Sequence, residues 1–410
     1  MDISKLREYA KLIVLSGVNV KPGEQVVIRT APEQLDFLEM VTEECYLAGA
    51  SKVVVDIRYQ PVSKLHIQYQ DVETLGRVEK WEEERLSHMA DVLPAMIYLE
   101  SDDPDGLNGI DSGKFAKAQQ ASYMVTKKYH DIMENKYKWC IAAVPGKKWA
   151  AKIFPGLSAA EAEEKLWEAI LSCARADVDP LKAWEEHNAN LARRCAWLNS
   201  LNLRRLVYKS ESTGTDLSVG LIPGCNFLGG AEKLPGSDVW YNPNIPSEEV
   251  FTSPKSGEAE GIVYSTRPLS YRGVLIEDFS VRFEKGKVVE VKARTNEDVL
   301  KVMVGMDEGA AMLGECALVP YNSPIRNSGI LFYNTLFDEN ASCHLALGRG
   351  FSNCLENYEQ YTLEQAREKG INESMIHEDF MIGSEDLCIT GITEDGREVP
   401  IFVNGDWAEQ

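Results

Sequence analysis

The chain has 410 residues, of which 44% are hydrophobic and 26% are charged. These values are typical of globular proteins, so a disordered chain is excluded, and the length favours two domains. The 64 acidic residues outnumber the 43 basic ones and give a net charge of −21, which opposes binding to nucleic acid.

The N-terminal residues and the cysteines indicate the compartment. No apolar run approaches the roughly 18 residues that a membrane-spanning helix needs. The opening stretch MDISKLREYAKLIV is charged throughout and lacks the apolar core of a signal peptide. The nine cysteines are widely spaced and include no C-x-x-C pair, which is typical of reduced thiols. We therefore expect a cytoplasmic protein with neither a membrane partner nor a nucleic-acid partner.

Helical and strand-like patterns alternate over the first half of the chain. Apolar residues at helical spacing predict helices at 3–16, 35–50, 79–90, 113–133, 159–172 and 180–200. Short apolar and β-branched runs predict strands at 23–30, 51–59, 96–101 and 138–145. This alternation predicts an α/β N-terminal domain, residues 1–200, with a mostly parallel sheet. The loops carry no G-x-G-x-x-G or phosphate-binding motif, so nucleotide binding is not indicated.

After about Asn202 the pattern becomes mainly β. Strand-like runs occur at 203–210, 215–222, 261–269, 273–293 and 398–403. The pairs Lys285-Gly286 and Asp395-Gly396 lie between alternating apolar runs and predict hairpin turns. One helix is expected at about 296–311. The pattern predicts a mainly antiparallel β (α+β) C-terminal domain, residues 201–410.

The segment IHEDFMIGS contains a histidine and an aspartate two positions apart. If it is extended, His377 and Asp379 project to the same side and Glu378 points away. Imidazole and carboxylate together suit a divalent transition metal. If the segment is helical, the two side chains diverge. A polar surface turn is the simpler alternative.

The other histidines are less informative. His344 follows a polar loop and opens a small apolar run, so it should lie at the edge of a packed element. A hydrogen-bonded structural histidine is the simpler alternative there. His66, His88, His130 and His187 lie among charged residues, and we expect them on solvated surfaces.

Two segments carry unusual glutamates. In NIPSEEVFTSP, prolines bracket Glu248 and Glu249, which face opposite ways if the chain is extended, so that only one can bind a metal. In GECALVP, Glu315 lies among small and apolar residues. A buried carboxylate needs a cation or a metal as its partner, and an internal salt bridge is the alternative.

The second half thus contains two histidines, one aspartate and at least two glutamates in separate short segments. These are the ligand types of a dinuclear centre, in which one carboxylate bridges ions roughly 3.5–4 Å apart and a water is activated between them. Spacing alone does not establish such a centre, because the segments lie far apart in the sequence.

The segments NIPSEEVFTSP, GECALVP, LFYNTLFDENASCHLALG and IHEDFMIGS, in this order and spacing, resemble the aminopeptidase T family of metallo-aminopeptidases, which includes bacterial peptidase S. The resemblance extends over essentially the whole chain. It implies a two-domain cytosolic homodimer that binds two divalent ions. The ligands it implies are Glu249, Glu315, His344, His377 and Asp379, with Glu315 as the bridge.

One position departs from the family pattern. A tyrosine associated with the site, as ligand or transition-state donor, stands in the family where this chain has Phe351. Phenylalanine has no hydroxyl and can take neither role. Either this chain dispenses with the hydroxyl, or Tyr333 or Tyr358 supplies it.

The sequence and the resemblance together predict a metal-dependent aminopeptidase that uses two ions of Zn²⁺, Co²⁺ or Mn²⁺ on peptides with a free N-terminus. The ions would polarise the scissile carbonyl and activate a water. Glu315 would take part in catalysis as the bridge, and Glu248 is a candidate general base because it neighbours a ligand. The alternatives are another metal-dependent amidohydrolase and a non-enzymatic peptide- or metal-binding protein.

Overall fold

The structure, a computed structural model, describes residues 2–408. Internal contacts group the chain into two compact units. The first unit holds the chain up to His187 together with Ala231–Ser247, and the second holds Asn188–Gly230 and the chain from Glu248 onward. The domain division at residue 200 stays a prediction. It did not anticipate that Ala231–Ser247 returns to the first unit.

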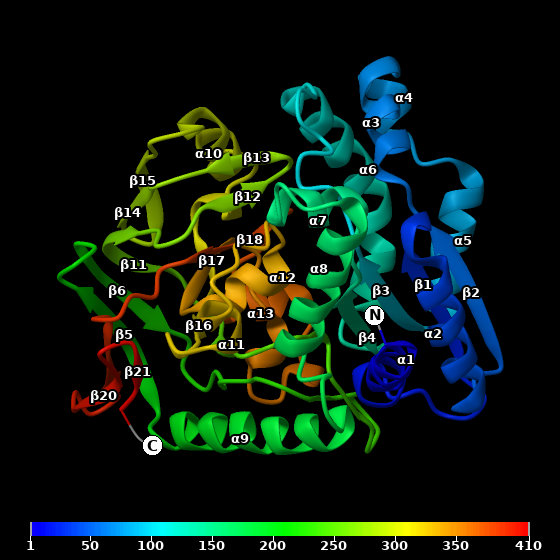
Figure 1. Cartoon of the computed structure of the whole chain (residues 1–410). Helices are drawn as coiled ribbons and strands as arrows, with labels where there is room; N and C mark the ends of the chain where they lie inside the picture. Colours follow the sequence, from blue (N-terminus) through cyan, green and yellow to red (C-terminus); the bar gives the residue numbers. More distant parts are fainter. Residues whose placement is uncertain (1, 409–410) are drawn as a thin grey trace. The chain divides into compact units, whose positions relative to one another are not determined.

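The first unit is built on a parallel sheet in the order β2-β1-β3-β4-β9, drawn in blue to green in Figure 1. Its strands are β1 (Gln25–Thr30), β2 (Lys52–Ile57), β3 (Ala95–Glu100), β4 (Trp139–Ala143) and β9 (Asn244–Ile245). The central strands are buried, with Ile28 paired to Ile97 and both fully inaccessible to solvent. Continuous apolar runs are typical of parallel strands covered on both faces. The predicted α/β unit with a parallel sheet is confirmed.

One or more helices follow each of the first four strands of this unit. The helices are α1 (Ile3–Leu12), α2 (Leu35–Leu47), α3 (Gln60–Tyr69), α4 (Val72–Gly76), α5 (Lys80–Val92), α6 (Ser112–Met133), α7 (Lys147–Ile153) and α8 (Ala159–Cys173), with a π-helix at Ile13–Gly17 and a 3-10 helix at Pro32–Gln34. Helix α9 (Pro180–Ser200) begins in this unit and continues into the second. Side-chain caps mark the N-termini of several helices. At the start of α8, for example, Ser158 and Glu161 form a capping box. A small hairpin, β7 (Glu232–Lys233) with β8 (Trp240–Tyr241), completes the unit.

The second unit contains an antiparallel sheet in the order β15-β14-β11-β6-β5-β19-β20-β21. Its strands are β5 (Leu203–Ser210), β6 (Thr215–Leu221), β11 (Pro254–Tyr264), β14 (Ser280–Glu284), β15 (Lys287–Lys292), β19 (Cys388–Thr393), β20 (Glu398–Val403) and β21 (Asp406–Trp407). The hairpin predicted at Lys285-Gly286 joins β14 to β15, and both residues have positive φ, at 50° and 78°. Such a turn matches the twist of the strands that it joins.

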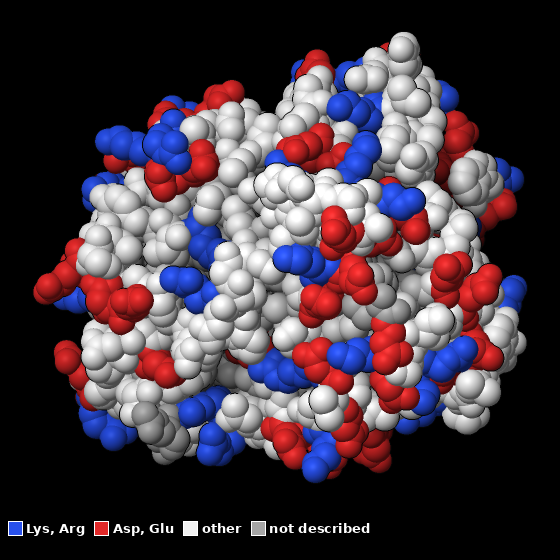
Figure 2. Space-filling view, in the orientation of Figure 1, with Lys and Arg blue, Asp and Glu red and all other residues white. Residues whose placement is uncertain are grey.

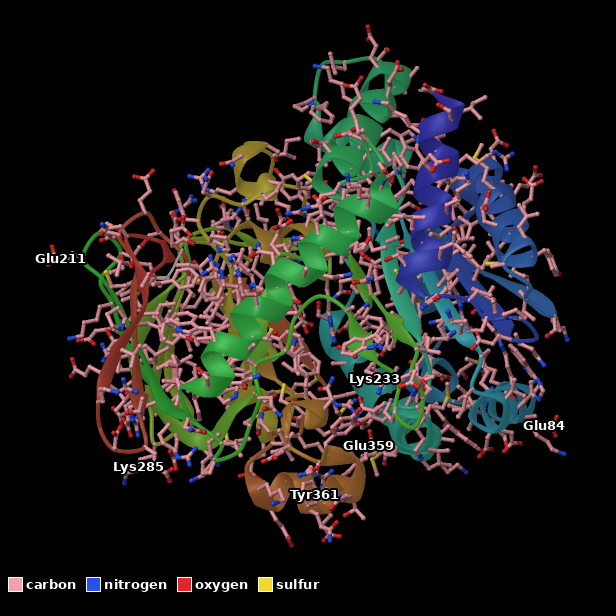
Figure 3. All side chains as sticks on the ribbon, turned by 90° about the horizontal axis from the view of Figure 1, so that it is seen from below. Glu84, Glu211, Lys233, Lys285, Glu359 and Tyr361 are labelled. Atoms are coloured by element: carbon pink, nitrogen blue, oxygen red, sulfur yellow. The ribbon has the colours of Figure 1, made fainter. Side chains whose placement is uncertain are left out.

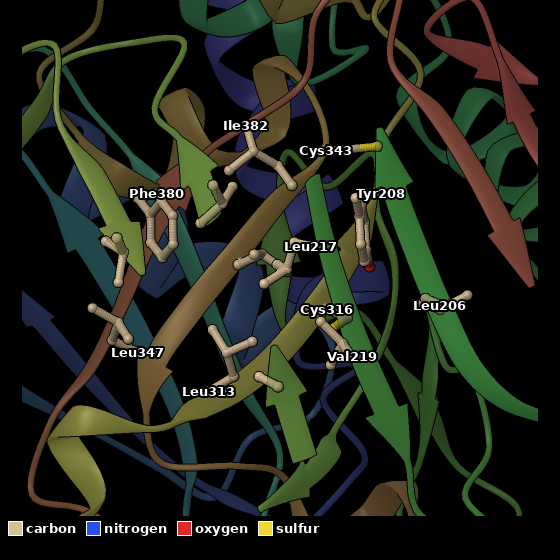
Figure 4. Packing of buried hydrophobic residues seen from close by; sticks show 14 of the residues in the cluster. Leu206, Tyr208, Leu217, Val219, Leu313, Cys316, Cys343, Leu347, Phe380 and Ile382 are labelled. Carbon is tan, nitrogen blue, oxygen red and sulfur yellow. The ribbon is translucent and has the colours of Figure 1, made fainter. Parts of the chain in front are cut away.

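A second antiparallel sheet, β10-β16-β17-β18, packs against the larger one. Its strands are β10 (Val250–Thr252), β16 (Leu313–Leu318), β17 (His344–Gly348) and β18 (His377–Met381). Figure 4 shows side chains from both sheets in one apolar layer. They include Leu206 and Tyr208 of β5, Leu217 and Val219 of β6, Cys316 of β16, Leu347 of β17 and Phe380 of β18. One face of the smaller sheet is therefore core, and the other is available for a site.

The remaining elements of the second unit are short. They are β12 (Leu269–Tyr271), β13 (Val274–Ile276), α10 (Glu297–Val304), α11 (Pro324–Asn327), α12 (Thr335–Asp338), α13 (Leu363–Lys369) and 3-10 helices at Gly309–Ala311, Glu339–Ala341, Ser352–Cys354 and Tyr358–Gln360. The helix predicted at 296–311 ends at Val304, and Gly305 is its C-cap. The antiparallel character predicted for this half is confirmed.

The surface is charged and mixed. Figure 2 shows acidic and basic side chains interspersed over the visible face, and Figure 3 shows Glu84, Glu211 and Lys285 reaching away from the ribbon. Among the described residues, no helix has the length and apolar character that crossing a membrane requires.

Candidate metal centre

Three neighbouring strands bring acidic and histidine side chains together. Glu315 of β16 pairs with Ala346 of β17, and Ala346 pairs with Asp379 of β18. Because side chains alternate between the faces of a strand, His344 shares the face of Ala346, and His377 shares the face of Asp379. The polar side chains therefore project from the face opposite the core, and the small Ala346 leaves space between the two carboxylates.

A β-bulge precedes Glu315. The register of β16 shifts between Leu313 and Glu315, at Gly314. A Cβ at Gly314 would lie 2.2 Å from the carbonyl oxygen of Arg349 and 2.4 Å from that of Gly348, so only glycine fits there. Bulges redirect side chains beside functional sites, and this one directs the Glu315 carboxylate.

The ligand atoms form two groups, and within each group the atoms lie within 4.8 Å of one another. The first group comes from Glu249, Glu315 and His344, and the second from Glu315, His377 and Asp379. Nε2 of His344 is 3.1 Å from Oε2 of Glu249. Nε2 of His377 is 3.0 Å from Oε2 of Glu315 and 3.4 Å from Oδ1 of Asp379. Glu315 belongs to both groups.

Main-chain carbonyls orient both histidines. Nδ1 of His377 lies 2.7 Å from the carbonyl oxygen of Arg349, and Nδ1 of His344 lies 3.3 Å from that of Ser342. A carbonyl oxygen only accepts, so each Nδ1 carries a proton and donates it. In the neutral ring, Nε2 then offers its lone pair toward the carboxylates, which is the tautomer that binds a metal.

The centre is buried and electronegative. Glu249, Glu315 and Asp379 are between 3% and 7% exposed, and His344 is 1% exposed. Burial raises the pKa of Glu315 to about 7, and repulsion from Glu249 and Asp379 adds to this effect. Burial opposes the charged form of His344, but contact with Glu249 and the charge of Asp379 raise its pKa to about 9. The site therefore favours positive charge.

Glu339 also belongs to this cluster, although the sequence did not single it out. It lies in the 3-10 helix before β17 and is 9% exposed. Burial, together with the charges of Asp379 and Glu249, raises its pKa well above the usual range. The available signal was an acidic residue in the segment LFDENASCH, five positions before His344.

These donors fit divalent cations. Among the described residues, Nε2 of His344 and Oδ1 of Asp379 are buried and make no regular hydrogen bond, although a charged neighbour lies 3.1 Å from the first and 3.4 Å from the second. A metal ion would satisfy both atoms. The cluster contains four carboxylates, from Glu249, Glu315, Glu339 and Asp379. Divalent ions would offset their charge, and carboxylate and imidazole are usual ligands of such ions.

The two neighbouring glutamates differ in position. Glu249 is in a ligand group, whereas Glu248 is in neither of the groups found among the described residues. Both are buried, at 7% and 6% exposure. The main-chain N–H of Glu248 donates to Oδ1 of Asn340, at 2.7 Å. This bond ties the chain just before β10 to the segment that carries Glu339.

Phe351 lies beside the cluster. Its ring centroid is 4.8 Å from that of His377 and 5.3 Å from that of Phe251. His187 was expected on a solvated surface, and this expectation is wrong. It is 8% exposed, Nε2 lies 2.7 Å from the carbonyl oxygen of Ser247, and its ring meets Trp184 edge-on. The charged neighbours on α9 concealed its buried position.

Comparison with known proteins gives a match over nearly the whole chain. The family model described as thermophilic metalloprotease (M29) matches residues 3–407. Aminopeptidase AmpS of Bacillus subtilis is 42% identical over 406 residues, which is 98% of each chain. Aminopeptidase T of Thermus thermophilus is 38% identical over 411 residues, covering 99% of this chain and 100% of that protein.

A solved structure agrees with these sequence matches. Wild-type AmpT from Thermus thermophilus superposes with a TM-score of 0.89 at 36% identity, and the match covers 99% of each chain. Both units of the present chain therefore have counterparts in that structure.

Proposed function

Because the chain belongs to the M29 family of metalloproteases and is a metallo-aminopeptidase, we propose that its acidic centre binds two divalent ions and uses them to release N-terminal residues from peptides. The proposed ligands are Glu249, Glu315, His344, His377 and Asp379. The ions are Zn²⁺, Co²⁺ or Mn²⁺, which these oxygen and nitrogen donors suit.

One observation carries the proposal of two ions rather than one. Glu315 contributes an atom to both ligand groups, so its carboxylate is suited to bridging two sites. Each group adds a histidine Nε2 and a second carboxylate, which gives the two sites similar donors. Glu315 is 3% exposed, and burial raises its pKa to about 7. Its charged form therefore needs positive partners.

The chemistry divides between the ions and the chain. Divalent ions held there would polarise the scissile carbonyl and lower the pKa of water, so that hydroxide is available as the nucleophile near neutral pH. Main-chain carbonyls hold His344 and His377 in the ligand tautomer, and the bulge at Gly314 aims Glu315. The buried carboxylates also favour the substrate's ammonium group over an acylated N-terminus.

Proton transfer to the leaving amine needs a further carboxylate. Glu248 is the base predicted from the sequence, and Glu339 is a second candidate because it interacts with Asp379 inside the cluster. Separate Glu248→Gln and Glu339→Gln variants decide between them. The base is the residue whose substitution lowers kcat by at least about 100-fold, in line with general-base contributions, while both metals remain bound.

The test of the activity compares a short peptide with its N-acetyl form and its C-terminal amide, with products followed by mass spectrometry. The free α-amine, with a pKa of roughly 8, is the expected anchor. We expect stepwise loss of single residues from the free peptide and from the amide, and no cleavage of the acetylated peptide. Comparable cleavage of the acetylated peptide would favour a general metal-dependent amidohydrolase instead.

The proposed homodimer and cytoplasmic location rest on resemblance to the bacterial aminopeptidases. Light scattering coupled to size-exclusion chromatography tests the first proposal. A mass near 46 kDa, that of one 45.8 kDa chain, would contradict it. Cell fractionation tests the second.

A further inference from the structure

Asn340 occupies a position between two segments of the metal centre. It lies in the 3-10 helix Glu339–Ala341 and is fully buried, at 0% exposure. Across from it is the chain just before β10, where Glu248 precedes Glu249. These two segments are 92 residues apart in sequence, and each carries acidic residues of the cluster.

The carboxamide of Asn340 uses both ends of its hydrogen-bonding group. Oδ1 accepts the main-chain N–H of Glu248 at 2.7 Å. Nδ2 donates to the carbonyl oxygen of Leu336 at 3.0 Å and to Oε1 of Glu339 at 3.3 Å. These partners fix the orientation of the amide. The N–H of Glu248 must face Oδ1, and the acceptor oxygens of Leu336 and Glu339 must face Nδ2.

Aspartate cannot replace this group. It matches asparagine in size and keeps the acceptor for Glu248, but it would place an oxygen against the carbonyl of Leu336 and the carboxylate of Glu339. Unpaired or repelling polar atoms are costly in a buried site. The position therefore requires a donor and an acceptor on one short side chain.

We propose that Asn340 is a positioning residue for the metal centre. Through its carboxamide it holds the segment of Glu249 against the segment of Glu339 and His344, and so it sets the affinity of the centre for divalent ions. This inference rests on the proposed metal function of the same cluster. Hydrogen-bonded residues behind metal ligands typically change metal affinity by about 10–100-fold when they are substituted.

The test is the affinity of the chelator-stripped full-length protein for Zn²⁺ alone, measured by competition with a chromophoric chelator. We expect Asn340→Asp to weaken Zn²⁺ binding by about 10–100-fold. The sign is informative, because a negative charge added near a cation site should by itself strengthen binding. Unchanged or tighter binding by Asn340→Asp would overturn the proposal.

Asn199 offers a matched control. Its carboxamide also accepts a main-chain N–H and donates to a main-chain carbonyl, both of Phe227, and it is half-buried. Asn199→Asp makes the same atomic change and should leave Zn²⁺ affinity within about threefold of the parent, whatever it does to stability. An equal loss of affinity in both variants would also overturn the proposal.

Two further variants keep the outcomes separate. If Asn340→Asp does not fold, the neutral Asn340→Ser decides, and parent-like affinity in that variant contradicts the proposal. Glu315→Gln tests the underlying site. Normal Zn²⁺ binding by Glu315→Gln would refute the metal centre itself, whereas loss in Glu315→Gln with parent-like binding in Asn340→Asp would refute only the role of Asn340.

Discussion

Glu315 is the side chain on which both proposed metal sites depend. Glu315→Gln keeps the size of the side chain but removes the charge that faces both ligand groups. We expect loss of both ions and of nearly all activity, measured by elemental analysis and by peptide release. Asp379→Asn should weaken mainly one site, because it belongs to one group only. A Glu315→Gln protein with two tightly bound ions would contradict the bridging role.

His66 provides the control for these substitutions. It is exposed on α3, and His66→Ala should leave metal content and activity close to those of the parent. His187 is unsuitable for this purpose because it is buried against Trp184.

Phe351 stands where the family resemblance implies a tyrosine, and its ring lies against that of His377. If the family hydroxyl is only an auxiliary donor, we expect Phe351→Tyr to stay active or to become modestly faster. If the added oxygen is buried without a partner, stability should fall by about 1–3 kcal/mol, visible as a lower Tm. An inactive variant that is stably folded and fully metallated would exclude both outcomes.

For single residues, the sequence was informative where a segment is a β-strand, because side chains on a strand alternate between its two faces. His377 and Asp379 lie two apart on the extended strand β18, the case in which the sequence placed them on one side, and Nε2 of His377 is 3.4 Å from Oδ1 of Asp379. Glu315 is buried, as its apolar neighbours indicated. Glu339 was not predicted, because its burial depends on strands that are distant in sequence. No local helical or strand periodicity identifies it as a buried residue.

At the scale of elements, β17 separates the site from the core. Ala346 lies between Glu315 and Asp379 in the register, and its side chain is fully buried. Ala346→Val would place two methyl groups between the carboxylates. Overpacking of this kind costs about 1–3 kcal/mol, and here it should also weaken metal binding strongly.

The control for Ala346→Val is Leu345→Val on the other face of β17. Leu345 packs in the apolar layer, so its truncation should lower Tm and leave metal affinity unchanged. Calorimetry and chelator competition on both variants measure the two effects. Equal metal loss in both would show that the faces of β17 are not functionally distinct.

Elements with strong periodicity or turn chemistry were predictable. The hairpins at Lys285-Gly286 and Asp395-Gly396 join β14 to β15 and β19 to β20. The two-residue strand β9 was not predictable, because two residues carry no period. Its addition to the parallel sheet depends on pairing with β4, a contact between residues about 100 positions apart.

For the molecule as a whole, the buried cluster links pH to stability. In the metal-free protein the pKa of Glu315 is about 7, against 4.5 for an ordinary glutamate, so between these values only the folded state keeps the proton. Stability therefore falls as pH rises through this window. The stabilising charge of His344 is present below pH 6.5 and is lost as pH rises through its folded pKa of about 9. Both groups act in the same direction.

We therefore expect the Tm of chelator-treated protein to fall between about pH 4.5 and pH 9. Metal binding favours the deprotonated ligands, so added Zn²⁺ or Mn²⁺ should reduce or reverse this fall. Differential scanning fluorimetry across the pH range, with and without metal, measures the difference. Parallel curves would mean that these groups do not bind the ions.

The division of β17 into two faces also has a genetic consequence. Substitutions at Leu345 and Leu347 should behave as temperature-sensitive alleles, whose defects disappear on cooling. Substitutions at His344 and Ala346 should fail at every temperature, and the milder ones should be suppressed by extra metal in the growth medium. In a saturation library scored for temperature sensitivity and for rescue by added metal, the type of defect should therefore alternate from one residue to the next along this strand.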